Sequence, residues 1–144
     1  CSEGYLNAFL ANELGIPVIL ITGNDLTVKD GARYAPNAVG VAVKTCVDRY
    51  SAICLPPEVT MKMIKDGARE SVKRISEVKK PQGPFTVKIQ FDSTQAVIPC
   101  TALPFVKQTG PKEIEYTLPT MVETQRAFGA ISTLVKSGIE EVYG

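Results

Sequence analysis

The first 25 residues constrain the fold most, because a helical pattern passes directly into an aliphatic run. The helical part ends at Gly15, a residue that commonly stops helices. Val18 to Ile21 is a short β-branched and aliphatic run that suits a buried strand. The chain is therefore predicted to begin with a helix that leads straight into a core strand.

Glu3 and Asn7 lie at unusual places in this opening helix. At about 100° per residue, its apolar stripe contains Leu6, Leu10, Ala11 and Leu14. Glu3 and Asn7 fall inside the same stripe. A carboxylate that is buried there needs a cation, a metal ion or strong hydrogen-bond donors. A second interpretation stays open: Ser2 is an ordinary N-cap residue, and Glu3 would then interact with the helix dipole while partly in water.

Composition excludes several classes of function. The 144 residues fit one domain, and 16 basic against 15 acidic residues leave a net charge of +1, so no overall field recruits nucleic acid or an anionic membrane. No apolar run approaches the roughly 20 residues of a membrane-spanning helix, and the start does not resemble a signal peptide. We therefore expect a cytoplasmic protein. The chain has no histidine, which excludes Ser-His and Cys-His catalysis by this chain alone.

The remainder of the first part predicts a βαβ unit. After the turn Gly23-Asn24-Asp25, a helix is expected over Leu26 to Tyr34 and a strand over Ala38 to Val43, parallel to the first strand. Pro56-Pro57-Glu58 then begins a helix that runs to about Val78. The buried stripe expected for this helix consists of Met63, Ile64, Ala68, Val72 and Ile75.

The second part is predicted to be rich in strands and closed by a helix. Strict alternation predicts a strand over Phe85 to Phe91, and a helical turn is expected around Thr94 to Val97, ended by Pro99. Two further strands, at 103–107 and 114–118, precede a helix from Pro119 to about Lys136. The fold class is thus α/β, with a seam at Pro81 to Pro84 that divides residues 1–80 from 81–144.

Three groups of residues are candidates for chemistry. Glu3, with Asn7 one turn on, supplies one carboxylate for a metal, although a zinc site needs three or more ligands. Cys1, as the first residue, is a candidate N-terminal nucleophile whose α-amino group serves as the base. Charged residues at the end of the second strand, namely Lys44, Asp48 and Arg49, lie where open α/β sheets bind ligands, although exposed loop charges are the default explanation.

Several motifs in the right order resemble a known family. Ser2 to Ala8, Gly15 to Asp25, Val43-Lys44 followed by Arg49, and Leu55 to Glu58 are similar to the C-terminal half of the zinc-dependent D-aminopeptidases associated with dipeptide transport operons. The similarity continues through Gln95-Ala96, Pro104 and the closing helix. It therefore covers nearly the whole chain.

The resemblance implies a cytoplasmic metallopeptidase that binds two zinc ions and removes N-terminal residues, preferably D-amino acids, from short peptides. It also implies a ring-shaped decamer. The family's Glu-x-x-x-Asn-Ala motif contains a zinc ligand that corresponds to Glu3, and we expect Asn7 to contact substrate.

One departure from the family is large. Its other zinc ligands, an Asp-x-Glu pair and two histidines, and its catalytic histidine lie upstream of this motif and have no counterpart here. We therefore expect half of an enzyme, completed by an N-terminal half that was cut off at Cys1 or is encoded separately. Two alternatives remain: a non-catalytic, ring-forming module, and an amidohydrolase that uses Cys1.

Overall fold

The computed structural model describes the backbone of residues 1–75 and 77–143, with side chains as far as residue 136. The chain divides into two compact units, Cys1–Pro81 and Gln82–Gly144, and each is described by itself. The first holds a mixed sheet with helices, and the second holds an antiparallel sheet and the C-terminal helix. The predicted α/β class is confirmed.

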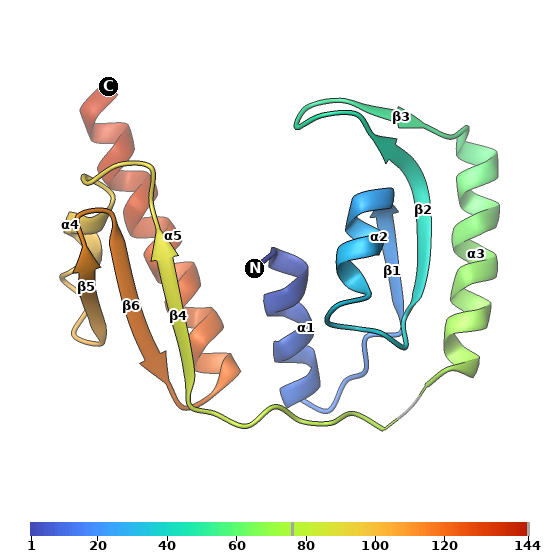
Figure 1. The fold of residues 1–144 in the computed structure, drawn as a ribbon, viewed down its shortest axis with the longest axis horizontal. Coiled ribbons are helices and arrows are strands. Elements are labelled where there is room, and N and C mark those ends of the chain that lie inside the picture. Colours follow the sequence, from blue (N-terminus) through green and yellow to red (C-terminus); the bar gives the residue numbers. More distant parts are fainter. Residues whose placement is uncertain (76, 144) are drawn as a thin grey trace. The chain divides into compact units, whose positions relative to one another are not determined.

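The first unit is built on a three-stranded sheet (Figure 1). Its elements are α1 (Glu3–Glu13), β1 (Leu20–Asn24), α2 (Asp25–Gly31), β2 (Val39–Cys46), β3 (Ala52–Cys54) and α3 (Pro57–Lys73). The strand order is β1-β2-β3, with β1 parallel to β2 and β3 antiparallel to it. The predicted parallel pair is confirmed, and β3 lies in a segment for which no strand was predicted.

Helices α2 and α3 cover opposite faces of the parallel pair. A Cβ added to Gly31 of α2 would meet the side chain of Ile21, whereas a Cβ added to Gly67 of α3 would meet Val41 and Leu20. Because successive strand residues point to opposite faces, Leu20 and Ile21 face different helices. Both helices lie close to the sheet, and at Gly67 an added Cβ would meet the stiff Val41 side chain, so glycine is needed there.

The predicted buried stripe of α3 is wrong in part. Gly67 and Ser71 are buried, but Ile64, Val72 and Ile75 are 36%, 60% and 58% exposed. The helix rests on the sheet through Gly67, and it ends at Lys73, so Ile75 lies beyond it rather than at its predicted place on a helix that runs to Val78. The Ser71 hydroxyl donates to the Ala68 carbonyl at 2.8 Å, which satisfies it inside the core.

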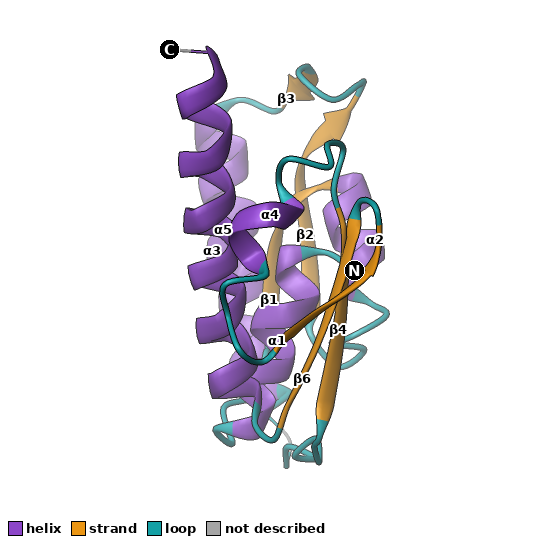
Figure 2. Cartoon of the chain, turned by 90° about the vertical axis from the view of Figure 1, so that its left-hand side faces the viewer, coloured by secondary structure: helices purple, strands orange, loops and turns teal. Residues whose placement is uncertain are grey.

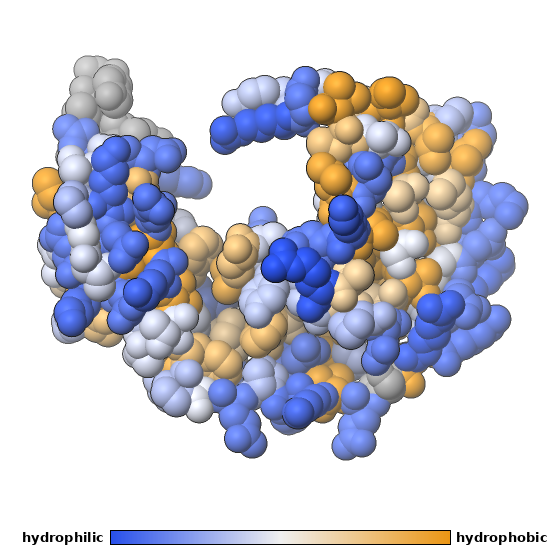
Figure 3. Space-filling view, viewed as in Figure 1, coloured by the Kyte–Doolittle hydropathy of each residue, from blue (hydrophilic) through white to orange (hydrophobic). Residues whose placement is uncertain are grey.

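Further apolar side chains lie exposed around β3 and the beginning of α3 (Figure 3). They are Ile53, Leu55 and Val59.

Among the described helices, none combines the length and the apolar character that a bilayer crossing requires.

The second unit is an antiparallel sheet with helices on one face (Figure 2). Its elements are β4 (Phe85–Gln90), α4 (Val97–Cys100), β5 (Val106–Gly110), β6 (Glu113–Leu118) and α5 (Met121–Tyr143), and the strand order is β4-β6-β5. Helix α5 contacts α4, β4 and β6. Pro99 lies inside α4 rather than ending a helical turn, so that prediction is wrong.

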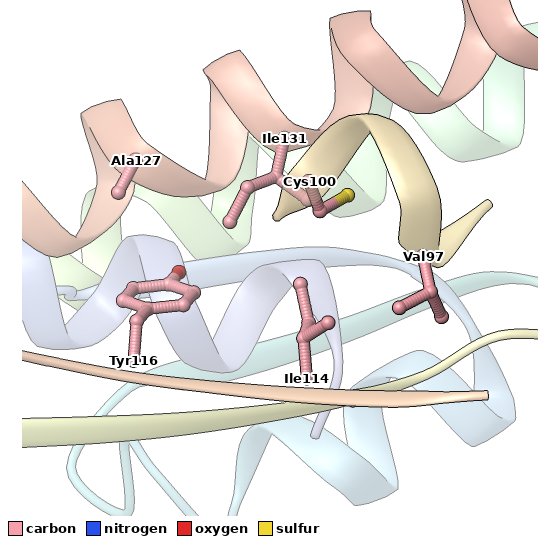
Figure 4. Packing of buried hydrophobic residues seen from close by; sticks show 6 residues of the cluster. All are labelled: Val97, Cys100, Ile114, Tyr116, Ala127 and Ile131. Atoms are coloured by element: carbon pink, nitrogen blue, oxygen red, sulfur yellow. The ribbon is translucent and has the colours of Figure 1, made fainter. Parts of the chain in front are cut away.

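The core of the second unit joins β6 to α4 and α5 (Figure 4). It consists of Val97, Cys100, Ile114, Tyr116, Ala127 and Ile131. Tyr116 is 2% exposed, and its hydroxyl donates to the Thr124 carbonyl at 3.2 Å. Burial raises the pKa of Tyr116 to about 12, because the phenolate would lose its hydration there.

Replacing Gly67 with alanine should destabilise the first unit by about 1–3 kcal/mol, because the new Cβ would overlap the stiff side chain of Val41. The matched control is Gly129→Ala in α5, where an added Cβ meets nothing within 4 Å. The control should stabilise its helix by about 0.5–1 kcal/mol. Denaturant unfolding of both variants measures the difference, and equal stabilisation by the two changes would contradict this packing.

The free energy of unfolding should fall above pH 10 through Tyr116. The unfolded tyrosine loses its proton near the ordinary tyrosine pKa of 10.0, whereas the folded one keeps it up to about 12. Between these two pH values, the free energy of unfolding should therefore fall by roughly 1 kcal/mol for each pH unit. Urea unfolding at pH 9 to 12 should therefore show a steeper loss for the native chain than for Tyr116→Phe. Parallel pH curves would contradict the assignment.

Candidate functional site

The N-terminal turn of α1 carries the candidate metal ligand. The Ser2 hydroxyl accepts from the Tyr5 backbone N–H at 3.3 Å and donates to Asp30 Oδ2 at 2.7 Å. Glu3 lies in the first turn and is exposed. Of the two interpretations left open for Glu3, burial in the core is therefore wrong, whereas the exposed position in the first turn after the Ser2 N-cap is confirmed. An exposed carboxylate remains available to bind a metal ion.

The rest of α1 also differs from the predicted stripe. Ala8 is the buried residue of the helix, whereas Leu14 is 56% exposed. Asn7 is exposed, one turn after Glu3. The two predicted site residues thus lie on the accessible surface of the same helix.

Aromatic packing holds the start of α1 against the end of α2. The rings of Tyr5 and Phe9 stack with centroids 4.6 Å apart, and Tyr5 meets Tyr34 edge-on at 5.7 Å. A Cβ at Gly4 would collide with the Tyr34 hydroxyl, so glycine allows this close approach. These contacts fix the backbone next to Glu3, which is what a metal ligand requires of its support.

An open pocket lies beside this turn. It is lined by Cys1, Ser2, Tyr5, Asp30 and Arg33. Asp30 accepts from the Arg33 guanidinium at 3.2 Å, so its charge is paired within the pocket. Cys1 is exposed there, and its thiol lies 3.6 Å from the Ser2 carbonyl. Its role as a nucleophile stays a prediction.

The residues of this chain do not make a zinc site by themselves. Within residues 1–75 and 77–136, no three His, Cys, Asp or Glu side chains come together in a way that could hold a metal. A zinc ion in a protein usually has at least three protein ligands. Glu3 fits the role of one metal ligand, and the described residues bring no second and third ligand to it.

The turn after β1 serves the fold. Asn24 accepts from the Thr27 backbone N–H at 2.7 Å and so caps α2, and Asp25 accepts from the Cys46 N–H at 2.8 Å. The cap follows a common sequence pattern, but the contact with Cys46 spans 21 residues and had no signal in the sequence.

The charged residues after β2 also serve a turn. Asp48 accepts from the backbone N–H groups of Tyr50 and Ser51, at 2.7 and 2.9 Å. Hydrogen bonds from Ser51 and Tyr50 lower the pKa of Asp48. The Arg49 guanidinium lies 5.6 Å from the centroid of the Tyr50 ring. Asp48 and Arg49 are therefore explained as exposed charged residues that stabilise this loop.

A family model and a curated protein that match this chain both describe a D-aminopeptidase. A family model for D-aminopeptidase matches residues 1–130. The chain is 23% identical, over 132 residues, to a D-aminopeptidase of Bacillus subtilis (strain 168), and this match covers 90% of the chain and 48% of that protein. The chain thus spans about half the length of the relative that it matches.

A solved structure shares the fold. The Zn-dependent D-aminopeptidase of Bacillus subtilis, a self-compartmentalizing protease, superimposes with a TM-score of 0.86 at 21% identity. The superposition covers 94% of this chain and 51% of that one. The family match over residues 1–130 takes in both units, apart from the end of α5. The chain therefore belongs to the D-aminopeptidase family.

Proposed function

We propose that this chain is the C-terminal half of a zinc-dependent aminopeptidase and that it donates Glu3 to a metal site that an N-terminal half completes. The observation that carries the proposal is the extent of the match. Nearly all of this chain corresponds to about half of its relatives, while its own sequence has no histidine. A zinc hydrolase assembled from such a chain must take its remaining ligands from elsewhere.

The surroundings of Glu3 support this role. Its carboxylate is exposed, and its backbone is held by the Ser2 cap and by the packing of Tyr5 on Tyr34. A buried, already paired carboxylate would have to be freed before it bound a metal, whereas this one does not. Asn7 lies exposed on the same helix, where it is proposed to contact the substrate.

Zinc, when bound, supplies a Lewis acid and a water of lowered pKa for hydrolysis. The contribution of this chain is more limited. Glu3 adds negative charge that favours a cation at this position, and α1 fixes where that charge lies. We propose two zinc ions in each complete site, as the family resemblance implies. The proposed reaction is removal of N-terminal residues, preferably D-amino acids, from short peptides.

The assembly is also a proposal. A structural relative is a self-compartmentalizing protease, and a ring-shaped decamer is the form that the family resemblance implies for this chain. A cytoplasmic location stays an expectation from the sequence.

Glu3→Gln should abolish the function of a reconstituted enzyme. The test mixes this chain with the half of the Bacillus subtilis relative that the match leaves uncovered, and it follows zinc content and D-dipeptide hydrolysis. Loss of one zinc ligand should lower zinc affinity by about 10-fold or more, and hydrolysis should fall with it. Glu58→Gln is the matched control, since Glu58 is another exposed first-turn glutamate, and it should change neither property.

The control separates the proposal from its rivals. If Glu3→Gln behaves like Glu58→Gln in an active complex, Glu3 acts only on the helix dipole, and the non-catalytic module becomes the better account. If the chain alone hydrolyses amides without metal and alkylation of Cys1 stops the reaction, the Cys1 amidohydrolase takes the place of both.

A further inference from the structure

We infer that the free edge of β1 is the docking site for a β-strand of the missing N-terminal half. This inference rests on the proposed function, since it concerns where on this chain that half binds. Beyond the proposed function, it names the surface that is bound, the mode of binding and the residues of β1 that are involved.

The first step is the direction of the backbone groups of β1. The Val39 N–H donates to the Ile19 carbonyl at 2.9 Å, and Leu20 is the register partner of Val39. In a parallel pair, alternate residues direct both of their backbone groups toward the same neighbour. Ile19 and Ile21 therefore face β2, whereas Leu20 and Thr22 direct their N–H and C=O groups toward the opposite edge. In the described sheet, β1 is the terminal strand on that side.

The second step is that β1 has the character of an interior strand. None of its five residues is charged, and both of its faces are covered by helices, as is usual for strands with parallel neighbours on each side. Proteins normally protect an edge with charges, proline or a very short strand. The other edge of this sheet follows that rule, because β3 has only three residues. β1 does not follow it over Leu20 to Thr22.

The third step is that apolar side chains are also exposed in the segment that precedes β1 in the sequence. Leu14 and Ile16 are 56% and 57% exposed. In β1 itself, Leu20 and Ile21 are only half-buried, although each packs toward a helix. Half-buried apolar side chains on an unpaired strand leave a surface that another segment can cover.

The fourth step identifies the occupant. The related structure superimposes on 94% of this chain, yet about half of that related chain has no counterpart here. A protein segment of comparable size therefore exists in the relative to pair with such an edge. Strand addition supplies main-chain hydrogen bonds, and the half-buried Leu20 and Ile21 of β1 supply apolar contact.

Hydrogen exchange, read at single amides, tests the inference. The probe is the uncovered half of the Bacillus subtilis relative, mixed with this chain. In the chain alone, the amides of Leu20 and Thr22 should exchange faster than that of Ile21. In the complex, exchange at Leu20 and Thr22 should slow by about 100-fold, because strand pairing protects them.

A pair of substitutions at one residue provides the second measurement. Thr22→Pro removes the N–H on the free edge without removing one that faces β2, and it should weaken binding of the probe at least about tenfold. Thr22→Val keeps the N–H and should bind as the native chain does. Circular dichroism of both variants shows whether the isolated chain still folds. The exchange measurement on the native chain does not depend on that outcome.

The outcomes separate this inference from the proposed function. If the halves bind and take up zinc while Leu20 and Thr22 stay unprotected, the docking site is elsewhere and only this inference falls. If the halves do not bind, both fall. If the two amides become protected in this chain alone as its concentration rises, the edge pairs copies of the chain, and the inference is overturned.

Discussion

The parallel pairing of β1 with β2 is the constraint on which the rest of this chain depends. A parallel pair requires a crossover, which is α2, and it requires apolar cover on both faces, which α2 and α3 provide. The close approach at Gly31 and Gly67 follows from that cover. The same pairing leaves one requirement unmet, because β1 has a neighbour on one side only in the described sheet. The partner proposed above would pair with this edge and would also supply the ligands that Glu3 lacks among the described residues.

The proposed metal site needs more ligands than the described residues bring together. Glu3 is held on a capped and packed helix turn, but the described residues bring no second and third ligand to it. Families that place ligands on separate segments of the chain lose the site when one segment is absent, even if the other segment folds correctly. The fold of this chain matches that of its relative with a TM-score of 0.86, and a shared fold is not by itself a shared chemistry.

Much of the architecture could be predicted from the sequence, because helix signals and strand periodicity are local. Proline at the start of α3 and strict alternation in β4 were sufficient for those two elements. The buried face of α3 could not be predicted, because hydrophobicity favoured Ile64 and Val72 while the approach to Val41 demanded Gly67. Glu3 shows the opposite failure. Its place in an apolar stripe suggested burial, but the Ser2 cap left it in solvent, and only the family resemblance marked it as a ligand.

We propose above all that this chain holds zinc only as part of a two-part site. Native mass spectrometry with metal analysis tests that claim most directly, on this chain alone and on this chain mixed with the uncovered half of the Bacillus subtilis relative. We expect the chain alone to carry no stoichiometric zinc and the pair to carry about two zinc ions, as a dinuclear hydrolase site requires. Stoichiometric zinc on the chain alone, or a stable pair without zinc, would contradict the account.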